Sequence, residues 1–219
     1  MAVRRHGSAR RLRLRIDHDQ QLIRLTVPGR ASARGALRWA GAQRLWVEHQ
    51  LAAAPPPIAF VDGAVIPFRG EQLRIGWSAG ERRGVRLAGT QLIAGGPQES
   101  LSRSIERWLR EQAREELSRA TAAVASLAGV AVKSVSIGDP ASRWGSCSAT
   151  GAIRYSWRLI LAPPEALRFV VAHEVAHRLH MNHSAAFKQA EERLFGGPVA
   201  PARALLREFG PALRRVGRG

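Results

Sequence analysis

The chain has 219 residues, of which 45% are hydrophobic and 23% are charged. This composition suits one domain or two small ones with a sizeable core, and it excludes a fully disordered, collagen-like or coiled-coil chain. The single cysteine, Cys147, excludes an intramolecular disulfide framework and a zinc finger built from cysteines. No apolar run reaches the roughly 20 residues of a membrane span, and no apolar segment follows the basic start as in a secretory signal. We therefore expect a cytoplasmic protein with no membrane partner.

The formal net charge of +17 comes almost entirely from arginine. Lys133 and Lys188 are the two lysines, so 32 of the 34 basic residues are arginines. The arginines are scattered along the whole chain, which is typical of a general arginine bias, but their densest run lies in residues 4–15. A basic chain also attracts nucleic acid without sequence preference. Both interpretations stay open, the second as a non-specific nucleic-acid contact.

The first half of the chain is predicted to be rich in strands. Residues 1–11 are expected to form a disordered basic arm. Alternating apolar residues predict strands at 12–16 and 22–27, joined by a turn at 17–20. Ser32 is a candidate N-cap for a helix over residues 33–53, which Pro55-Pro56-Pro57 ends.

Short segments with β-forming residues and intervening glycines come next and predict a small antiparallel sheet. They lie at residues 58–61, 65–68, 73–77, 85–87 and 91–94. Gly95-Gly96-Pro97 predicts a break in the chain. We therefore expect a β-rich N-terminal subdomain over residues 12–97 and a catalytic subdomain over residues 98–219.

The second half is predicted to begin with a long amphipathic helix over residues 101–127, with Ser100 as its N-cap and Gly129 ending it. A strand is expected at residues 130–137 and two more within residues 142–161. Pro163-Pro164 predicts the start of another helix, because proline is tolerated in the first turn. Residues 166–172 of that helix are nearly all apolar, so it is expected to be buried.

The buried helix carries the sequence His173-Glu174-Val175-Ala176-His177. Residues four apart on a helix lie on one face one turn apart, so both imidazoles can reach the same ion. Glu174 is offset by one position, which places its carboxylate beside the open coordination position of that ion. A metal would also compensate for polar side chains on a buried helix.

A catalytic zinc needs a third protein ligand, and His180 and His183 compete for that role. On a continuous helix His180 lies about 10 Å beyond His173 along the axis. His183 can return to the ion if the chain turns at Met181-Asn182, because asparagine tolerates the left-handed conformation that closes helices. We predict one Zn²⁺ held by His173, His177 and His183, and His180 remains the alternative ligand or a neighbour of the site.

Three neutral histidines leave the zinc its full charge, which lowers the pKa of a bound water to about 7. Glu174 is predicted to accept the proton of this water as it attacks a carbonyl carbon, and then to pass it to the leaving nitrogen. The expected reaction is metal-assisted amide hydrolysis. Arg143 could bind substrate or an oxyanion, or could form a structural ion pair, and both interpretations stay open.

Several motifs occur together in one order, and the flanking sequence resembles the YgjP-like metallopeptidase family, which is grouped with the SprT-like zincins. The motifs are Ser142-Arg143-Trp144-Gly145-Ser146-Cys147-Ser148, Trp157-Arg158-Leu159-Ile160-Leu161-Ala162-Pro163-Pro164, His173-Glu174-Val175-Ala176-His177 and His180-Met181-Asn182-His183-Ser184. The resemblance implies an α+β, zincin-like core in which the active-site helix packs on a small antiparallel sheet. It also implies zinc at the three predicted histidines, Glu174 as the base, and a hairpin at residues 143–147 near the helix. One departure is Lys188, where the family usually has tryptophan.

The leading hypothesis is a zinc metallopeptidase, a metal-dependent hydrolase of the His-Glu-x-x-His type that acts on a protein or peptide. One alternative is a basic, nucleic-acid-associated module whose zinc is mainly structural. Glu174 argues against it, because a structural site does not need that carboxylate. The other alternative is a metal-dependent hydrolase of non-peptide amides.

Overall fold

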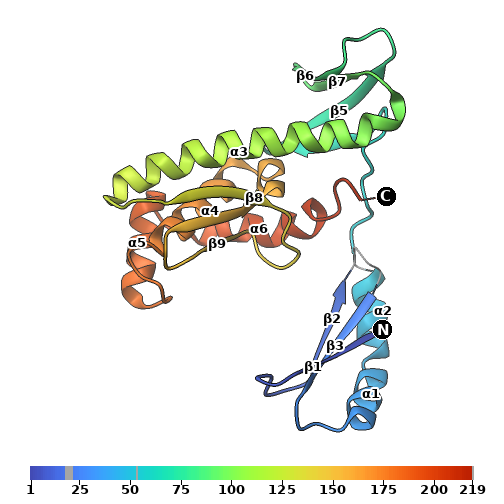
Figure 1. Cartoon of the computed structure of the whole chain (residues 1–219), viewed down its shortest axis with the longest axis vertical. Helices are drawn as coiled ribbons and strands as arrows, with labels where there is room; N and C mark the ends of the chain where they lie inside the picture. Colours follow the sequence, from blue (N-terminus) through green and yellow to red (C-terminus); the bar gives the residue numbers. More distant parts are fainter. Residues whose placement is uncertain (18–21, 53, 219) are drawn as a thin grey trace. The chain divides into compact units, whose positions relative to one another are not determined.

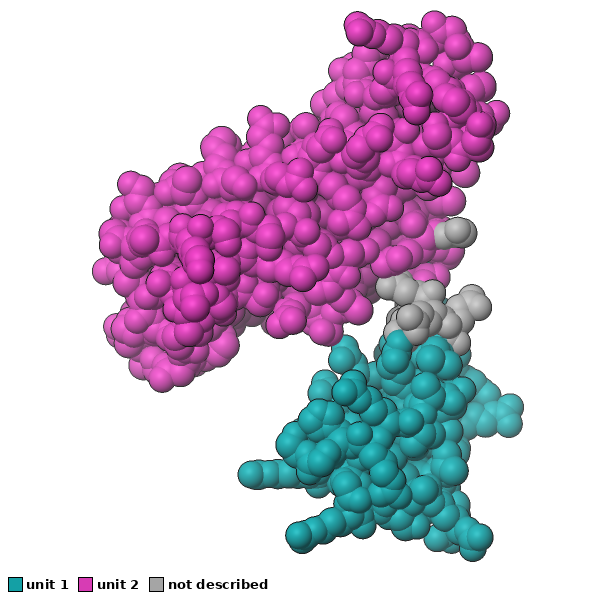
Figure 2. Space-filling view, in the orientation of Figure 1, with its two compact units in different colours: residues 1–56 teal, residues 57–219 magenta. Residues whose placement is uncertain are grey.

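The computed structural model describes residues 1–17, 22–52 and 54–218 and divides the chain into two compact units (Figure 2). Unit 1 comprises residues 1–56 and unit 2 residues 57–219. The division falls within Pro55-Pro56-Pro57 rather than at the predicted boundary near residue 97. In the described ranges no helix is long and apolar enough to cross a membrane.

Unit 1 contains a three-stranded sheet (Figure 1). Its strands are β1 (Ala2–His6), β2 (Arg13–Asp17) and β3 (Leu22–Pro28), in the order β1-β3-β2. The predicted strands at 12–16 and 22–27 are confirmed and pair antiparallel, while most of their predicted turn lies outside the described residues. The predicted arm contains β1 instead, because its backbone pairs in parallel with the free edge of β3. A strand needs only backbone partners for this, so charged side chains do not prevent it.

The predicted helix over residues 33–53 is two helices, α1 (Ala33–Ala42) and α2 (Arg44–Ala52), separated at Gln43. The hydroxyl of Ser32 accepts a hydrogen bond from the Gly35 amide, so this predicted N-cap is confirmed. The break allows both helices to contact the sheet, α1 at β3 and α2 at β2. A small core joins α1 to the sheet: Leu25, Val27, Ala36 and Ala40.

Unit 2 begins with a four-stranded sheet made of β4 (Val65–Phe68), β5 (Glu71–Ser78), β6 (Gly84–Ala88) and β7 (Gln91–Gly95). Four of the five predicted segments are therefore strands, while residues 58–61 contribute only an isolated bridge from Ile58 to Val216. The strand order is β4-β5-β7-β6, and β5 and β7 are parallel, so the sheet is mixed rather than antiparallel. The β6–β7 hairpin returns β7 alongside β5 in the same direction, a long-range pairing that strand patterns do not specify.

Helix α3 (Leu101–Ala128) follows, and it explains why residue 97 is not a boundary between compact units. It contacts β6 and β7 of the first sheet and also α4 (Pro164–Ala176) and β8 (Ser134–Gly138) (Figure 1). One hydrophobic core therefore includes buried residues from Phe60 to Val216. Gly129 ends α3 in the left-handed conformation as predicted, but the Ser100 hydroxyl donates to the Pro97 carbonyl instead of capping the helix.

The second sheet of unit 2 consists of β8, β9 (Gly145–Cys147) and β10 (Ala152–Ser156), in the order β8-β10-β9. The pairing of β8 with β10 is parallel and that of β9 with β10 antiparallel, so this sheet is also mixed. A 3₁₀ helix (Trp157–Leu161) leads to α4, and α5 (Ala185–Phe195) and α6 (Ala200–Leu213) pack against it. The α+β fold class is confirmed. Helix α4 is surrounded by other elements, and it contacts β9, α3, α5 and α6.

Candidate metal centre

Helix α4 carries the first two histidines because its sequence makes it a buried helix. Pro164 occupies its first turn, and the apolar residues that follow are buried. His173 lies in its last turn, and His177 caps its C-terminal end. The predicted burial of this helix is confirmed.

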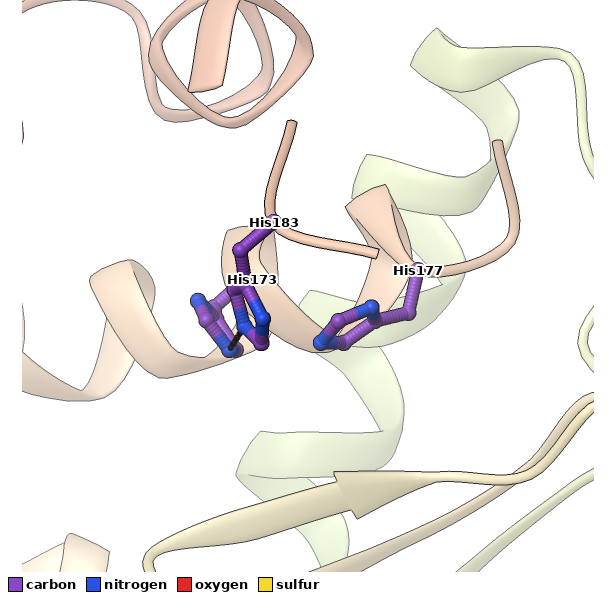
Figure 3. Close-up of side chains that lie close together, drawn as sticks. All are labelled: His173, His177 and His183. Carbon is purple, nitrogen blue, oxygen red and sulfur yellow. Dashed lines mark hydrogen bonds between the residues drawn. The ribbon is translucent and has the colours of Figure 1, made fainter. Parts of the chain in front are cut away.

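Three imidazoles converge at the end of α4 (Figure 3). His173, His177 and His183 each offer a ligand nitrogen, and these atoms lie within 4.8 Å of one another. The chain turns after α4, so His183 returns to the face of the helix, and its Nε2 lies 3.4 Å from Nε2 of His173. His180 is not part of this cluster. Its backbone carbonyl instead lies 3.2 Å from Nδ1 of His177.

The two helix histidines are oriented by acceptors on their Nδ1 atoms. Nδ1 of His173 lies 2.7 Å from the Glu191 carboxylate, and Nδ1 of His177 faces the His180 carbonyl. A carboxylate and a carbonyl can only accept, so each Nδ1 must donate, and in the neutral imidazole the lone pair is then on Nε2. Burial lowers the pKa of both imidazoles below the ordinary value, although Glu191 acts in the opposite direction on His173. The neutral, metal-binding form is therefore favoured.

Glu191 was missed in the sequence. Its side chain is 1% exposed, and it joins His173 to Arg203, whose guanidinium lies 3.1 Å from the second carboxylate oxygen. A signal was present: Phe187, Ala190 and Leu194 form the buried stripe of α5, and Glu191 lies on that stripe. An acidic residue on the apolar face of an amphipathic helix needs a partner.

Phe187 forms the packed contact between α5 and the cluster. Its ring centroid lies 5.1 Å from His173, 4.6 Å from His177 and 4.7 Å from His183. The Ser184 hydroxyl accepts a hydrogen bond from the Phe187 amide and caps α5. Lys188 is exposed, so the departure from the tryptophan at this position leaves the packing of α5 on the histidines intact.

Glu174 lies beside the histidines in a buried position. Its side chain is 4% exposed, and burial raises its pKa to about 7, while the charge of Arg143 acts to lower it. Gly145 of β9 lies directly against its carboxylate, and a Cβ at that position would overlap it. The expected hairpin is thus observed, with β9 in contact with α4.

Arg143 precedes this hairpin and is exposed. Its charge acts on Glu174, but it forms no ion pair or hydrogen bond with any residue that the structure describes. No ion pair of Arg143 is therefore seen among the described residues, and its role toward a substrate stays a prediction.

Comparison with known proteins places this chain in a family. The family model described as YgjP-like, metallopeptidase domain, matches residues 10–208. The chain belongs to the YgjP-like metallopeptidase family. A search of curated proteins finds no match. Among solved structures, the chain is similar to the crystal structure of the metallopeptidase zymogen of Pyrococcus abyssi abylysin, with 19% identity and a TM-score of 0.39 over 46% of this chain and 97% of that chain.

Membership in a metallopeptidase family implies a divalent metal, and the donor set of this YgjP-like chain fits one. Three imidazole nitrogens converge, and imidazole suits Zn²⁺ among the first-row metals. Two of them have their second nitrogen hydrogen-bonded, as metal-binding histidines almost always do. His173, His177 and His183 are the residues that could hold the ion.

Proposed function

We propose that this chain is a zinc-dependent peptidase that cleaves peptide bonds in proteins, with Glu174 as the general base. The observation that carries the proposal is the buried carboxylate of Glu174 next to three converging imidazoles. A structural metal site needs only the ligands. A desolvated carboxylate beside it has a cost in folding free energy, and a proton-transfer role accounts for its presence.

His173, His177 and His183 hold the metal, and bound zinc supplies Lewis acidity toward a carbonyl and toward water. Glu174 accepts a proton from the attacking water and delivers it to the nitrogen of the departing amine. A pKa of about 7 suits both steps, because such a group can accept and release a proton near neutral pH. Arg143 is exposed and provides positive charge near Glu174, where it favours negative charge developing on a substrate oxygen.

The first test separates binding of the metal from catalysis. Purified, tag-free protein is assayed for zinc content and for hydrolysis of fluorescently labelled, unfolded casein. We expect Glu174→Gln to keep its zinc and to lose at least about 100-fold in rate, as is usual for a general base. We expect His183→Ala to lose zinc and His180→Ala to retain it, because the His180 contribution is its backbone carbonyl.

Three outcomes would contradict the proposal. Equal activity of Glu174→Gln and the unsubstituted protein would show that Glu174 is not the general base. Stoichiometric zinc without hydrolysis of casein would favour a structural metal or, if small amides are cleaved, a non-peptide amide substrate. Loss of zinc in His180→Ala but not in His183→Ala would show that His180, and not His183, is the third ligand.

A further inference from the structure

The sheet of unit 1 has one strongly basic face. The pairing register places Arg4 of β1 and Arg13 of β2 on either side of Thr26 of β3, and Arg15 next to Arg24 two residues away. The opposite face is apolar and packs on α1 through a small core: Leu25, Val27, Ala36 and Ala40.

Three of these arginines are exposed, and no described residue pairs with them. Arg4, Arg13 and Arg15 form no hydrogen bond or ion pair with the residues that the structure describes, and we call these three the basic face. Two other arginines of unit 1 do have partners. Arg5 donates to the Gly29 carbonyl, and Arg44 pairs with Glu48.

The charge is concentrated in unit 1. Its 56 residues contain eleven arginines and three acidic residues, a net charge of +8. The remaining 163 residues carry +9 of the total of +17. A uniform arginine bias would distribute the net charge in proportion to length, so composition alone does not account for this unit.

A hollow of about 460 Å³ lies beside β2, within unit 1. Arg11 and Arg13 line it together with Trp39 of α1 and Trp46 of α2. Trp39 and Trp46 are 37% and 42% exposed, although tryptophan is on average a highly buried residue. Arg13 belongs to both features, so the basic face and the hollow are adjacent.

We propose that unit 1 binds single-stranded nucleic acid, with phosphates on the basic face and an unstacked base in the hollow against Trp39 or Trp46. Arginines that follow the backbone and aromatic side chains that stack on bases are the combination found in single-strand binding surfaces. A duplex keeps its bases stacked and cannot fill the hollow. A membrane interface favours aromatic side chains that protrude, whereas these two line a concavity.

The phosphate contacts are tested by salt dependence. Binding of a fluorescein-labelled twelve-nucleotide oligothymidine to the full chain is followed by anisotropy at several salt concentrations. The triple variant Arg4→Gln/Arg13→Gln/Arg15→Gln is expected to lose about 2 from the slope of log affinity against log salt, since each single-strand phosphate contact contributes about 0.7. The matched control is Arg103→Gln/Arg107→Gln/Arg114→Gln, which removes the same charge from exposed positions of α3 and is expected to keep the slope unchanged.

The base contact is tested by Trp39→Leu/Trp46→Leu, which keeps apolar side chains but removes the stacking surface. We expect affinity to fall at least about fivefold with no change in the salt slope, because base stacking on aromatic residues contributes little charge. A duplex of the same length is expected to bind more weakly and to be insensitive to this variant. Circular dichroism verifies that each variant is folded.

Three results would overturn the assignment. Equal loss of salt slope in both arginine triples would mean a diffuse charge effect. Duplex binding as tight as single-strand binding and unaffected by the tryptophan variant would mean phosphate contact alone. Binding to vesicles containing phosphatidylserine without binding to the oligonucleotide would assign the surface to lipid. The experiment uses neither metal nor hydrolysis, so its failure would not affect the peptidase proposal.

Discussion

The two buried carboxylates near the histidine cluster, those of Glu174 and Glu191, have different environments. Among the described residues, burial is the main influence on the pKa of Glu174 and raises it to about 7, while the charge of Arg143 acts to lower it. Glu191 is just as buried but receives Nδ1–H of His173 and the guanidinium of Arg203. The first arrangement suits a group that exchanges a proton, and the second suits one that holds a neighbour in place.

Glu191→Gln tests this positioning role. The substitution keeps the size of the side chain and removes the charge that accepts from His173. We expect the Kd for zinc to rise about 10–100-fold, because partners of this kind orient a metal-binding imidazole and fix its tautomer. Competition with a chelating dye at fixed pH measures the Kd.

The control for Glu191 is its neighbour Glu192, which is exposed on the same helix. Glu192→Gln is expected to change the Kd by no more than about twofold, as for most surface substitutions. If both substitutions weaken zinc binding equally, the effect is one of general charge and Glu191 has no special role.

Asp139 anchors the end of the chain through Arg158. The guanidinium of Arg158 is buried, donates to both oxygens of Asp139 at 2.8 and 3.2 Å, and also donates to the carbonyls of Leu213 and Val216. Burial raises the pKa of Asp139, but the hydrogen bond and charge of Arg158, with the charges of Arg218 and Arg110, outweigh it and hold the pKa below its ordinary value.

Asp139→Asn is expected to lower the free energy of unfolding by about 3 kcal/mol at pH 7, because it leaves the buried Arg158 charge uncompensated. The folded-state pKa is depressed, so the contribution of the carboxylate is complete above the ordinary aspartate pKa of about 4 and is lost as the pH falls through the lower folded value. The difference between the two proteins should therefore narrow below about pH 4. Urea unfolding at a series of pH values measures it.

Glu106→Gln serves as the control for this measurement, since it breaks a half-exposed pair with Arg110 on α3. It is expected to cost no more than about 0.5 kcal/mol. A difference for Asp139→Asn that does not depend on pH would contradict the ionic origin of the effect.

Among the contacts between secondary-structure elements, the one between β9 and α4 determines the position of Glu174. Gly145 brings the backbone of β9 against the side chain of Glu174, and no other residue type leaves the carboxylate where it lies. The β9–β10 hairpin thereby becomes one wall of the site. The glycine of the Arg143–Cys147 motif is thus required by packing, which the motif alone does not indicate.

Gly145→Ala is expected to displace Glu174 rather than to unfold the protein, because the overlapping atoms belong to a side chain that can rotate. Misplacement of a catalytic group by about 1 Å can cost 100-fold in rate, and we expect a loss of that order with zinc content unchanged. Hydrolysis of labelled casein and zinc content are measured together.

The control is Gly76→Ala on β5, where an added Cβ would meet nothing within 4 Å. It is expected to keep full activity. Loss of zinc in Gly145→Ala would show that the hairpin holds the metal cluster itself, contrary to this expectation.

The molecule as a whole contains two separate hydrophobic cores, one in each unit. The core of unit 1 is small, whereas that of unit 2 joins both of its sheets and α3 to α4. The three clustered histidines that could hold a metal all belong to unit 2. Binding of a metal therefore stabilises unit 2 directly, since a ligand stabilises the folded part that binds it.

Calorimetry of the full chain is expected to show two unfolding transitions, of which zinc raises only one. At free zinc about 1000-fold above its Kd the stabilisation is about 4 kcal/mol, which corresponds to roughly 10 °C for a unit of this size. The His183→Ala variant is expected to lose this shift. A single transition that zinc moves as a whole would contradict the independence of the two cores.

Much of the fold follows from local patterns in the sequence. The alternation in residues 12–16, the helical spacing from Leu101 to Ala128 and the αL conformation of Gly129 are all properties of a few consecutive residues. The prediction of a disordered arm at residues 1–11 was wrong because a contact with a distant segment, and not the local pattern, determines their structure. Their charge suggested disorder, but the free edge of β3 offered backbone partners to Ala2–His6.

For the site, the sequence by itself determined that His173 and His177 lie one turn apart on a buried helix with Glu174 between them, because helical spacing is a local property. Only the tertiary structure brought His183 rather than His180 into the cluster with His173 and His177, since the path of the chain after α4 depends on how α5 packs through Phe187. Glu191 and Gly145 became part of the site in the same way, through contacts between elements distant in sequence. Such contacts depend on the packing of whole elements, which no short pattern of residues encodes.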